Sequence, residues 1–441
     1  MSLSKIAVLS PAAGNGNLGD EASLTALMQN IRRRHPHIEI YVISANPRDT
    51  EIRHRVQAWP VGRRVGRAPI DGKLNQSTAG VTESASLRNV CAWGRVKAAL
   101  KRAPFVFRLL KRVYGIPGLG FAILAEGRFL AASLRRVKRT DLLVMSGSGS
   151  FCDHFGGPFN FPYTIFKWTL LARVAGIPVI FPSVGLGPLL SPLSRLLVRA
   201  SLTLAEYRTV RDVTSQKLLR EVGWTGKTPV FPDLAYSLDV PENSGGTTRG
   251  GLLVGINVFP HFDARFWPDA DPAKYERYID CIASFVAWLF QHGYRVALFP
   301  TQIRADTMVI DDVKHLVSQR YSPEVAQSLL ESSVRHVSDL LCVLSSVDLV
   351  VASRFHGTLL SFLLNRPVIS TSNHHKTSDL MKSMGQASYL LDIESLTLQG
   401  LVERFTLLSS HRETVCREVA ERVADFQLAL IRQYEGLFDD V

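Results

Sequence analysis

Short apolar runs alternate with helix-like stretches along most of this 441-residue chain, and this rhythm is what most limits its fold. Lys5–Ser10 and Ile38–Ser44 have the pattern of strands. Asp20–His35 between them has the pattern of a helix, with Asp20 as its expected N-cap. Because strand, helix and strand make a βαβ unit, the sequence predicts an α/β fold with parallel sheets.

The same rhythm returns in two blocks, separated by the polar, glycine-containing linker 241–249. Further strands are expected at 141–145, 179–183, 209–211, 229–231, 252–257, 295–300, 349–352 and 368–370. Further helices are expected at 164–175, 191–204, 212–222, 273–292, 337–346, 356–364 and 401–434, the last with a break near 409–411. This order predicts two Rossmann-like domains, 1–240 and 250–441, facing each other across a cleft.

A basic segment, 50–138, interrupts the first domain. Between Arg53 and Arg139 there are 19 Lys and Arg against three acids, a net charge of +16, so the rest of the chain carries about −4. Its second part, from Ala103, mixes Phe, Leu and Val with basic residues and is expected to form two amphipathic helices. Such a segment suits an anionic membrane surface, while a passive insertion stays open as the alternative. Nucleic acid is not expected, because no recognised binding motif accompanies the charge.

The five cysteines include no C-x-x-C pair, so we expect neither a disulfide framework nor a metal site, and a reducing, cytoplasmic location. The longest apolar stretches are broken by Pro, Gly or Asp, which argues against a membrane-spanning helix. The first residues have the pattern of a strand and not of a signal peptide.

The opening loop contains Gly14, Gly16 and Gly19, which spell G-x-G-x-x-G after the first strand. In a dinucleotide site a pyrophosphate occupies the helix N-terminus. Here Asp20 and Glu21 already occupy that end and would repel a second anion. A tight Gly-Asn turn is therefore favoured over an NAD site, and a sugar-binding or general-base role for Asp20 stays open.

The segment after the strand 349–352 is the strongest candidate for chemistry. Arg354 can bind a carboxylate or phosphate, His356 can transfer protons near neutral pH, and Gly357 allows close approach to the backbone. Lys376, beyond the next strand, adds a cation. An Arg-x-His pair alone is as often a structural ion pair; the added Lys favours a site at this sheet edge.

Glycine-rich segments follow two strands of the first domain, at 146–150 and 184–188, and the segment 232–238 follows a third. Singly each is a turn, but as a set they predict a cleft wall where backbone N–H groups approach a ligand. The candidate substrate-binding residues are Gly16, Asn17, Gly19, Ser148, Gly149, Asp153, Gly185, Gly187, Arg211, Asp233, Ser353, Gly357 and Lys376.

These segments, in this order, resemble the polysaccharide pyruvyl transferase family. The similarity runs through "GNLGDEASL", "SGSGSF", "IPVIFPSVGLGPL", "VRDVTSQKLLREVG", "PDLAYSL" and "SRFHGTLLSFLLNRPVIS", and covers nearly the whole chain outside 50–138. Two departures are Ser146-Gly147-Ser148-Gly149, where many members have three glycines, and the basic insertion.

The resemblance implies a GT-B-like fold and transfer of the pyruvyl group of phosphoenolpyruvate to two hydroxyls of one sugar, giving a cyclic ketal. It implies that Arg354 and His356 are central to the donor site, with phosphoenolpyruvate as a substrate and no cofactor. On the residues themselves, Arg354, Lys376 and Arg211 would neutralise the donor. Protonated His356 would be the acid, and Asp20 or Asp153 the base.

The acceptor is expected to be a glycan or lipid-linked saccharide, which would place the enzyme at the inner face of the membrane. Two other classes stay open. A GT-B-like glycosyltransferase would use Arg354 and Lys376 for a nucleotide-sugar diphosphate. A non-catalytic scaffold would keep the fold alone, and the intact Arg-Phe-His set argues against it.

Overall fold

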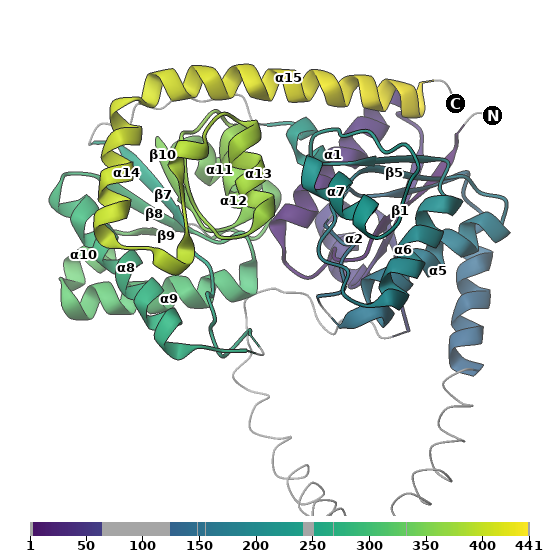
Figure 1. The fold of residues 1–441 in the computed structure, drawn as a ribbon, viewed down its shortest axis with the longest axis horizontal. Helices are drawn as coiled ribbons and strands as arrows, with labels where there is room; N and C mark the ends of the chain where they lie inside the picture. Colours follow the sequence, from purple (N-terminus) through teal and green to yellow (C-terminus); the bar gives the residue numbers. More distant parts are fainter. Residues whose placement is uncertain are drawn as a thin grey trace, which may run out of the picture. The chain divides into compact units, whose positions relative to one another are not determined.

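A computed structural model describes residues 3–63, 124–147, 149–154, 156–240, 251–267, 269–331 and 333–439. Two six-stranded parallel sheets organise the chain (Figure 1). The first has the order β3-β2-β1-β4-β5-β6, and every neighbouring pair is parallel. Its elements are β1 (Lys5–Ser10), α1 (Leu18–Arg34), β2 (Glu39–Ser44), α2 (Pro47–His54), β3 (Gln57–Pro60), β4 (Leu142–Met145), η1 (Gly157–Phe159), α5 (Phe161–Val174), β5 (Val179–Val184), α6 (Pro192–Leu204), β6 (Tyr207–Val210), α7 (Val213–Glu221) and η2 (Leu234–Ser237).

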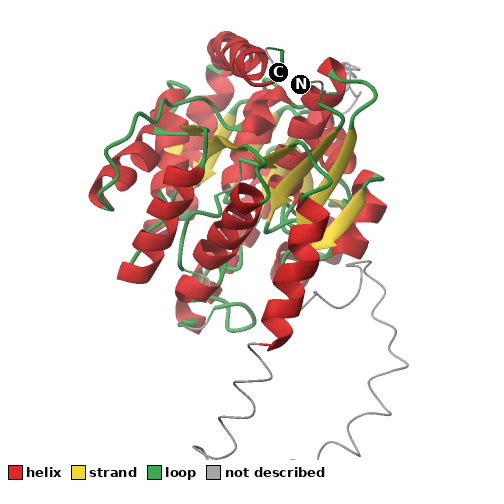
Figure 2. Ribbon diagram, turned by 90° about the vertical axis from the view of Figure 1, so that its right-hand side faces the viewer, coloured by secondary structure: helices red, strands yellow, loops and turns green. Residues whose placement is uncertain are grey.

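The second sheet repeats this topology in the order β12-β11-β10-β7-β8-β9, again with parallel neighbours. Helices flank the strands in both halves (Figure 2). The elements are β7 (Leu253–Asn257), α8 (Pro272–Gln291), β8 (Arg295–Phe299), α9 (Ile303–Arg320), α10 (Pro323–Ser328), β9 (Leu330–Glu331), α11 (Val337–Ser346), β10 (Leu349–Ala352), α12 (Phe355–Leu363), β11 (Val368–Thr371), α13 (His375–Ser383), η3 (Ala387–Tyr389), β12 (Leu390–Leu391), η4 (Ile393–Ser395), α14 (Leu398–Ser410) and α15 (Arg412–Phe438).

The predicted α/β class with two Rossmann-like halves is confirmed, because both sheets have the doubly wound strand order with its switch between the two central strands. Three local expectations were wrong. Helix α1 begins at Leu18 and its N-cap is Asn17, whose side chain accepts from the Gly19 amide, so Asp20 lies inside the first turn. Residues 229–231 form only an isolated bridge, from Val230 to Val210. Helix α9, in a stretch for which no element was expected, follows β8.

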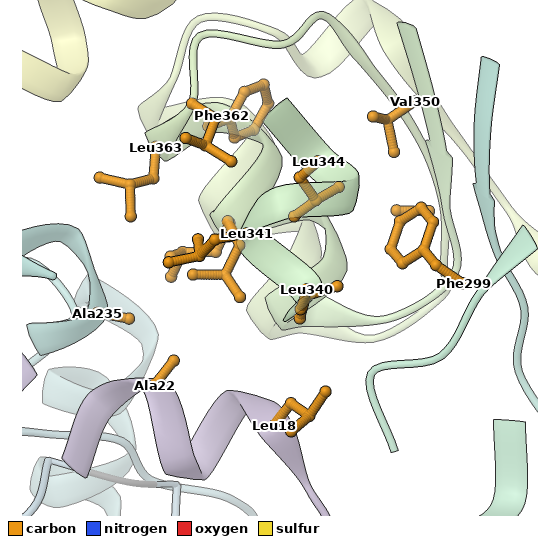
Figure 3. Close-up of a cluster of buried hydrophobic side chains, with 14 of the residues drawn as sticks. Leu18, Ala22, Ala235, Phe299, Leu340, Leu341, Leu344, Val350, Phe362 and Leu363 are labelled. Carbon is orange, nitrogen blue, oxygen red and sulfur yellow. The ribbon is translucent and has the colours of Figure 1, made fainter. Parts of the chain in front are cut away.

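An apolar cluster joins the two sheets. Leu18 and Ala22 of α1 lie opposite Leu340 and Leu341 of α11, and all four side chains are buried (Figure 3). Burying apolar side chains stabilises the fold by about 1.5–3 kcal/mol each for the larger ones. The two halves therefore share one core, which fixes the strand ends of one half against those of the other.

The last helix returns to the first half. α15 starts beside α14 and crosses to η2 and α1 (Figure 1). Near its end, Gln433 accepts from Ser183 Oγ at 3.1 Å and donates to Thr209 Oγ1 at 2.7 Å, and the Tyr434 hydroxyl lies 3.2 Å from Ser237 Oγ. The C-terminal part of α15 thus packs with the first sheet, although the sequence assigns it to the second domain.

Within the segment 50–138, α2 and β3 continue the regular order of the first sheet as far as Pro60. Residues 124–137 are helical. Residues 64–123, and with them most of the expected basic amphipathic segment 53–139, lie outside the described residues. None of the helices that are described is long and apolar enough to cross a membrane.

Candidate active site

Two cations meet at the carboxyl edges of the two sheets. Arg211 directly follows β6, and Lys376 lies in the first turn of α13, after β11. A Cβ added at Gly149, after β4, would lie 3.1 Å from Lys376 Nζ and 3.5 Å from Arg211 Nη2. The chain therefore places a glycine where the two cations converge, and a small anion can approach both cations there.

Neighbouring groups fix the position of Arg211. Its Nη1 donates to Asp233 Oδ2 at 2.8 Å, and its guanidinium lies 4.5 Å from the centre of the Phe355 ring. Asp233 also accepts from Ser23 Oγ and from the Ala235 amide. A Cβ at Gly185 would come within 2.5 Å of Arg211 Nε. Gly185 is thus required to make room for the guanidinium, and Asp233 is required to orient it.

Lys376 is held close to another positive charge. Burial, and then the nearby Arg211 guanidinium, lower the pKa of Lys376 to about 8. Both effects disfavour the charged ammonium in the unliganded site. A dianionic or trianionic ligand would reverse them, so the pair is suited to bind a compact polyanion.

Asp20 and Glu21 in the first turn of α1 have different surroundings. Glu21 is buried, accepts from the Gly14 amide, and lies 2.5 Å from His54 Nε2. Asp20 accepts only from Asn17 Nδ2, at 2.8 Å, among the described hydrogen bonds. Burial, and then the Glu21 carboxylate, raise the pKa of Asp20 to about 6. Asp20 is therefore the carboxyl group that can hold and release a proton near neutral pH.

His356, in the first turn of α12, packs against the backbone of α1. A Cβ at Gly19 would lie 1.9 Å from His356 Nδ1, so only glycine fits beside the ring. His356 Nε2 is buried and has no hydrogen-bond partner within the described structure. Burial lowers the pKa of His356 to about 4. Burial thus favours the neutral imidazole in the unliganded protein, and the expected role of a protonated His356 as the acid stays a prediction.

Arg354 is paired with a buried acid of the second half. Its Nε donates to Asp306 Oδ1 at 3.0 Å, and its guanidinium packs 4.6 Å from the centre of the Phe259 ring. Asp306 is fully buried and also accepts from the Thr301 and Gln302 amides. In this structure Arg354 positions the loop after β8, and its expected direct role in donor binding stays a prediction.

That loop is attached to the first half through the backbone. The Leu18 amide donates to Thr301 O at 2.8 Å, and the Ile303 amide donates to Gly16 O at 2.9 Å. Asn17 and Gln302 form an antiparallel bridge. Gly16 and Asn17 thus belong to a contact that sets the start of α1, and with it the position of Asp20.

Two other predicted site residues, Asp153 and Ser353, make hydrogen bonds that hold the fold together. Asp153 accepts from the Leu190 and Ser191 amides at the start of α6. Burial alone would raise its pKa, but these hydrogen bonds outweigh burial and the pKa of Asp153 is lowered, which argues against a role as base. The Ser353 hydroxyl lies between Tyr278 Oη and Thr371 Oγ1.

Gly357 and Gly187 are packing positions. A Cβ at Gly357 would meet Asn257 Oδ1 at 2.6 Å, and one at Gly187 would meet Cys152 Cβ at 2.7 Å. Ser148 lies outside the described residues. The structure therefore brings together Asp20, Gly19, Gly149, Gly185, Arg211, Asp233, His356 and Lys376 from the predicted set.

Sequence reasoning missed Asp306, which orients Arg354, and Phe355, which stacks on Arg211. An acid in the first turn of a helix that follows a strand is the signal that marks Asp306, but α9 itself was not predicted. Among the residues that the structure describes, no three His, Cys, Asp or Glu are grouped as a metal site.

Comparison with known proteins finds a family model that matches most of the chain. Residues 17–375 match a family model described as "Polysaccharide pyruvyl transferase". The amylovoran biosynthesis protein AmsJ of Erwinia amylovora is 22% identical over 334 residues, which cover 70% of this chain and 75% of the relative.

Solved structures share the fold at low sequence identity. The Staphylococcus aureus MnaA–UDP co-structure has a TM-score of 0.55 at 9% identity, covering 100% of this chain and 98% of the other. The UDP-GlcNAc 2-epimerase of Methanocaldococcus jannaschii has a TM-score of 0.52 at 10% identity, covering 91% and 92%. At these identities the likeness shows the two-domain fold alone.

Proposed function

Because the chain belongs to the polysaccharide pyruvyl transferase family, and so is a transferase, we propose that it moves the pyruvyl group of phosphoenolpyruvate onto a sugar of an exopolysaccharide. The product is a cyclic ketal, in which two hydroxyls of one sugar bond to the former C2 of the donor. The relative AmsJ, which is named for the biosynthesis of amylovoran, supports an exopolysaccharide as the destination.

One observation carries the proposal: Arg211 and Lys376 converge at Gly149, beside Asp20 and His356. Phosphoenolpyruvate carries a phosphate and a carboxylate on the same carbon, C2. Arg211 offers a planar fork of donors and Lys376 a point charge, which suits one anion each. Binding the donor would also relieve the repulsion that lowers the pKa of Lys376.

The two neighbouring titratable groups divide the proton transfers. Asp20, with a pKa of about 6, holds a proton more readily than His356, with a pKa of about 4. We therefore assign to Asp20 the proton that is added to C3 of the donor, which makes C2 electrophilic. The neutral imidazole of His356 accepts the proton of the first attacking sugar hydroxyl. This assignment reverses the roles expected from the sequence.

The remaining step replaces phosphate. After the first hydroxyl has bonded to C2, the C2–O bond to phosphate breaks and the second hydroxyl attacks C2. The proton of the second hydroxyl leaves with the phosphate, so no oxidant, reductant or further reactant is needed. Asp20 is reprotonated by the proton that His356 received.

Three finer parts of the proposal concern the acceptor and its place. We propose a lipid-linked saccharide as the form in which the glycan is presented, at the inner face of the membrane. The basic segment 53–139, with its net charge of +16, supports contact with an anionic lipid surface. Binding to vesicles of anionic lipid at low salt tests this contact, and no binding would reject it.

Donor preference tests the proposed reaction. The thermal stability of the protein is measured with phosphoenolpyruvate and with a panel of nucleotide sugars. Phosphoenolpyruvate should stabilise the wild type, and Arg211→Gln or Lys376→Met should abolish that shift. Lys217→Met, at an exposed position of α7, is the matched control and should keep it. Stabilisation by a nucleotide sugar alone would favour a glycosyltransferase and overturn the proposal.

A further inference from the structure

Three buried hydroxyl groups join strand ends of the second half, and the steps described so far give them no role. Tyr278 of α8 is 3% exposed, Ser353 after β10 is 7% exposed, and Thr371 at the end of β11 is fully buried. Tyr278 Oη lies 2.8 Å from Ser353 Oγ, which lies 2.6 Å from Thr371 Oγ1. These three side chains form one hydroxyl network across the neighbouring strands β10 and β11.

The hydroxyl network has a direction, and it begins at a third strand end. The amide of Phe259, two residues after β7, donates to Tyr278 Oη at 3.1 Å. Because an amide N–H only donates, the tyrosine oxygen accepts there, and its own proton is available to Ser353. Burial raises the pKa of Tyr278, so the phenol keeps this proton at neutral pH. Ser353 then accepts from Tyr278 and donates to Thr371, so each hydroxyl group depends on the one before it.

Thr371 is the residue from which the loop to Lys376 starts. Within this loop the His374 amide donates to Ser372 Oγ at 3.1 Å. The Lys376 amide in turn donates to Nδ1 of His374 at 3.2 Å, which makes His374 the N-cap of α13. Side chains of the loop itself thus link Lys376 back to the strand end, and the hydroxyl network holds that strand end.

Ser353 starts the other segment that carries site residues. It directly precedes Arg354 and lies three positions before His356. The Ser353 amide donates to Asn257 O at the end of β7, at 3.1 Å. The ring of Phe259, whose amide opens the network, packs 4.6 Å from the guanidinium of Arg354. Tyr278 therefore connects the ends of β7, β10 and β11 at the edge of the sheet that holds the proposed donor site.

We propose that Tyr278 is a positioning residue for the donor site, an inference that rests on the proposed function: its hydroxyl, through Ser353 and Thr371, fixes the loop that holds Lys376 beside Arg211. Removing the hydroxyl leaves the Phe259 amide without this acceptor and frees Ser353 and Thr371 to form other hydrogen bonds. The ammonium of Lys376 is then held less closely to Arg211. Both the charge state of Lys376 and the affinity for the donor should change.

Tyr278→Phe removes the first hydroxyl of the network, and Tyr275→Phe is its matched control. Tyr275 lies one turn earlier on α8, and its hydroxyl also has two partners, since it donates to Asp312 and accepts from Arg265. A general loss of stability would therefore affect both variants. Thr371→Val removes the far end of the network with little change of shape, and it is the second test of the same role.

The first readout is the titration of Lys376 in the protein without ligand. Its reaction with a trace of acetylating reagent is followed against pH by mass spectrometry, because only the neutral amine reacts. Lys376 should titrate at about 8 in the wild type and in Tyr275→Phe, and closer to the ordinary lysine value of 10.5 in Tyr278→Phe and Thr371→Val. The Kd for phosphoenolpyruvate should rise about two- to tenfold in the last two variants. Combining them should weaken binding no further, because both act through one network.

The outcomes distinguish the two proposals. If the wild type does not bind phosphoenolpyruvate, the proposed function fails, and the titration of Lys376 alone decides the role of Tyr278. A folded Tyr278→Phe variant in which Lys376 titrates as in the wild type overturns the positioning role, and so does an equal shift in Tyr275→Phe. If Tyr278→Phe does not fold, Thr371→Val decides: an unchanged titration of Lys376 overturns the role, and a raised one supports it.

Discussion

The ion pair between Arg354 and Asp306 gives the sharpest test of how the site is held together. Asp306 is fully buried, while the Arg354 side chain is 24% exposed. Arg354→Ala leaves the carboxylate with the Thr301 and Gln302 amides and the Thr301 hydroxyl. Breaking a buried pair costs about 3–5 kcal/mol. Because Arg354 is partly exposed, we expect the lower end, a loss of about 3 kcal/mol in the free energy of unfolding.

A double variant shows whether the loss comes from the stranded charge. Arg354→Ala with Asp306→Asn removes the charge, so it should be more stable than Arg354→Ala alone, with a coupling energy of about 1–3 kcal/mol. Urea denaturation followed by tryptophan fluorescence measures all four proteins. If Arg354→Ala keeps wild-type stability and loses only phosphoenolpyruvate binding, Arg354 is a donor ligand and our interpretation is wrong.

Three further predictions concern the proton-transfer groups and the cation. Burial raises the pKa of Asp20 from 3.8 to about 6, so the ionised carboxylate destabilises the fold above pH 6. Asp20→Asn should therefore raise the free energy of unfolding by about 2–3 kcal/mol at pH 8 and leave it unchanged at pH 4. Equal effects at both pH values would refute this. Gly19→Ala should lower the free energy of unfolding by about 1–3 kcal/mol, because the added Cβ overlaps His356. Combining Gly19→Ala with His356→Ala should restore stability in the same urea assay. If it does not, the imidazole ring is not the obstacle. The kcat/KM for the donor should fall as pH rises through about 8, where Lys376 loses its proton. Lys376→Arg should move this decline to higher pH. A decline that stays at the same pH in the variant would belong to another group.

The strand order and the edge that carries the site follow from local patterns in the sequence. Buried parallel strands are continuous apolar runs, so β1, β4, β10 and their neighbours could be identified with few errors. Within each sheet the carboxyl ends share one edge, and the two halves were expected to face each other across a cleft, which is why Arg211 and Lys376, one from each half, were expected to bind the same donor although 165 positions separate them.

The roles of individual side chains could not be predicted in the same way. Arg354 and Asp153 carry the charges that catalysis uses, but each finds a partner from a distant segment, Asp306 in one case and the α6 amides in the other. A helix N-cap and a buried ion pair use the same residue types as an active site. Only the fold shows which of these groups have their hydrogen bonds satisfied.

Protonation states also depend on packing that the sequence does not show. His356 has an ordinary motif context, yet burial against Gly19 keeps it neutral. Asp20, predicted as an N-cap, is displaced into the first turn by Asn17, where burial, and then the neighbouring Glu21 carboxylate, raise its pKa. The acid and base roles that we propose for these two residues follow from this burial.

The most direct test of the account is the product formed in deuterated water. The protein is incubated with phosphoenolpyruvate and with the extracellular glycan of a strain that lacks the gene, and the glycan is analysed by NMR and mass spectrometry. The account predicts a pyruvyl ketal whose methyl group carries one deuterium, with phosphate released in equal amount. A glycan that gains no ketal while phosphoenolpyruvate is consumed, or that gains a sugar from a nucleotide-sugar donor instead, would contradict it.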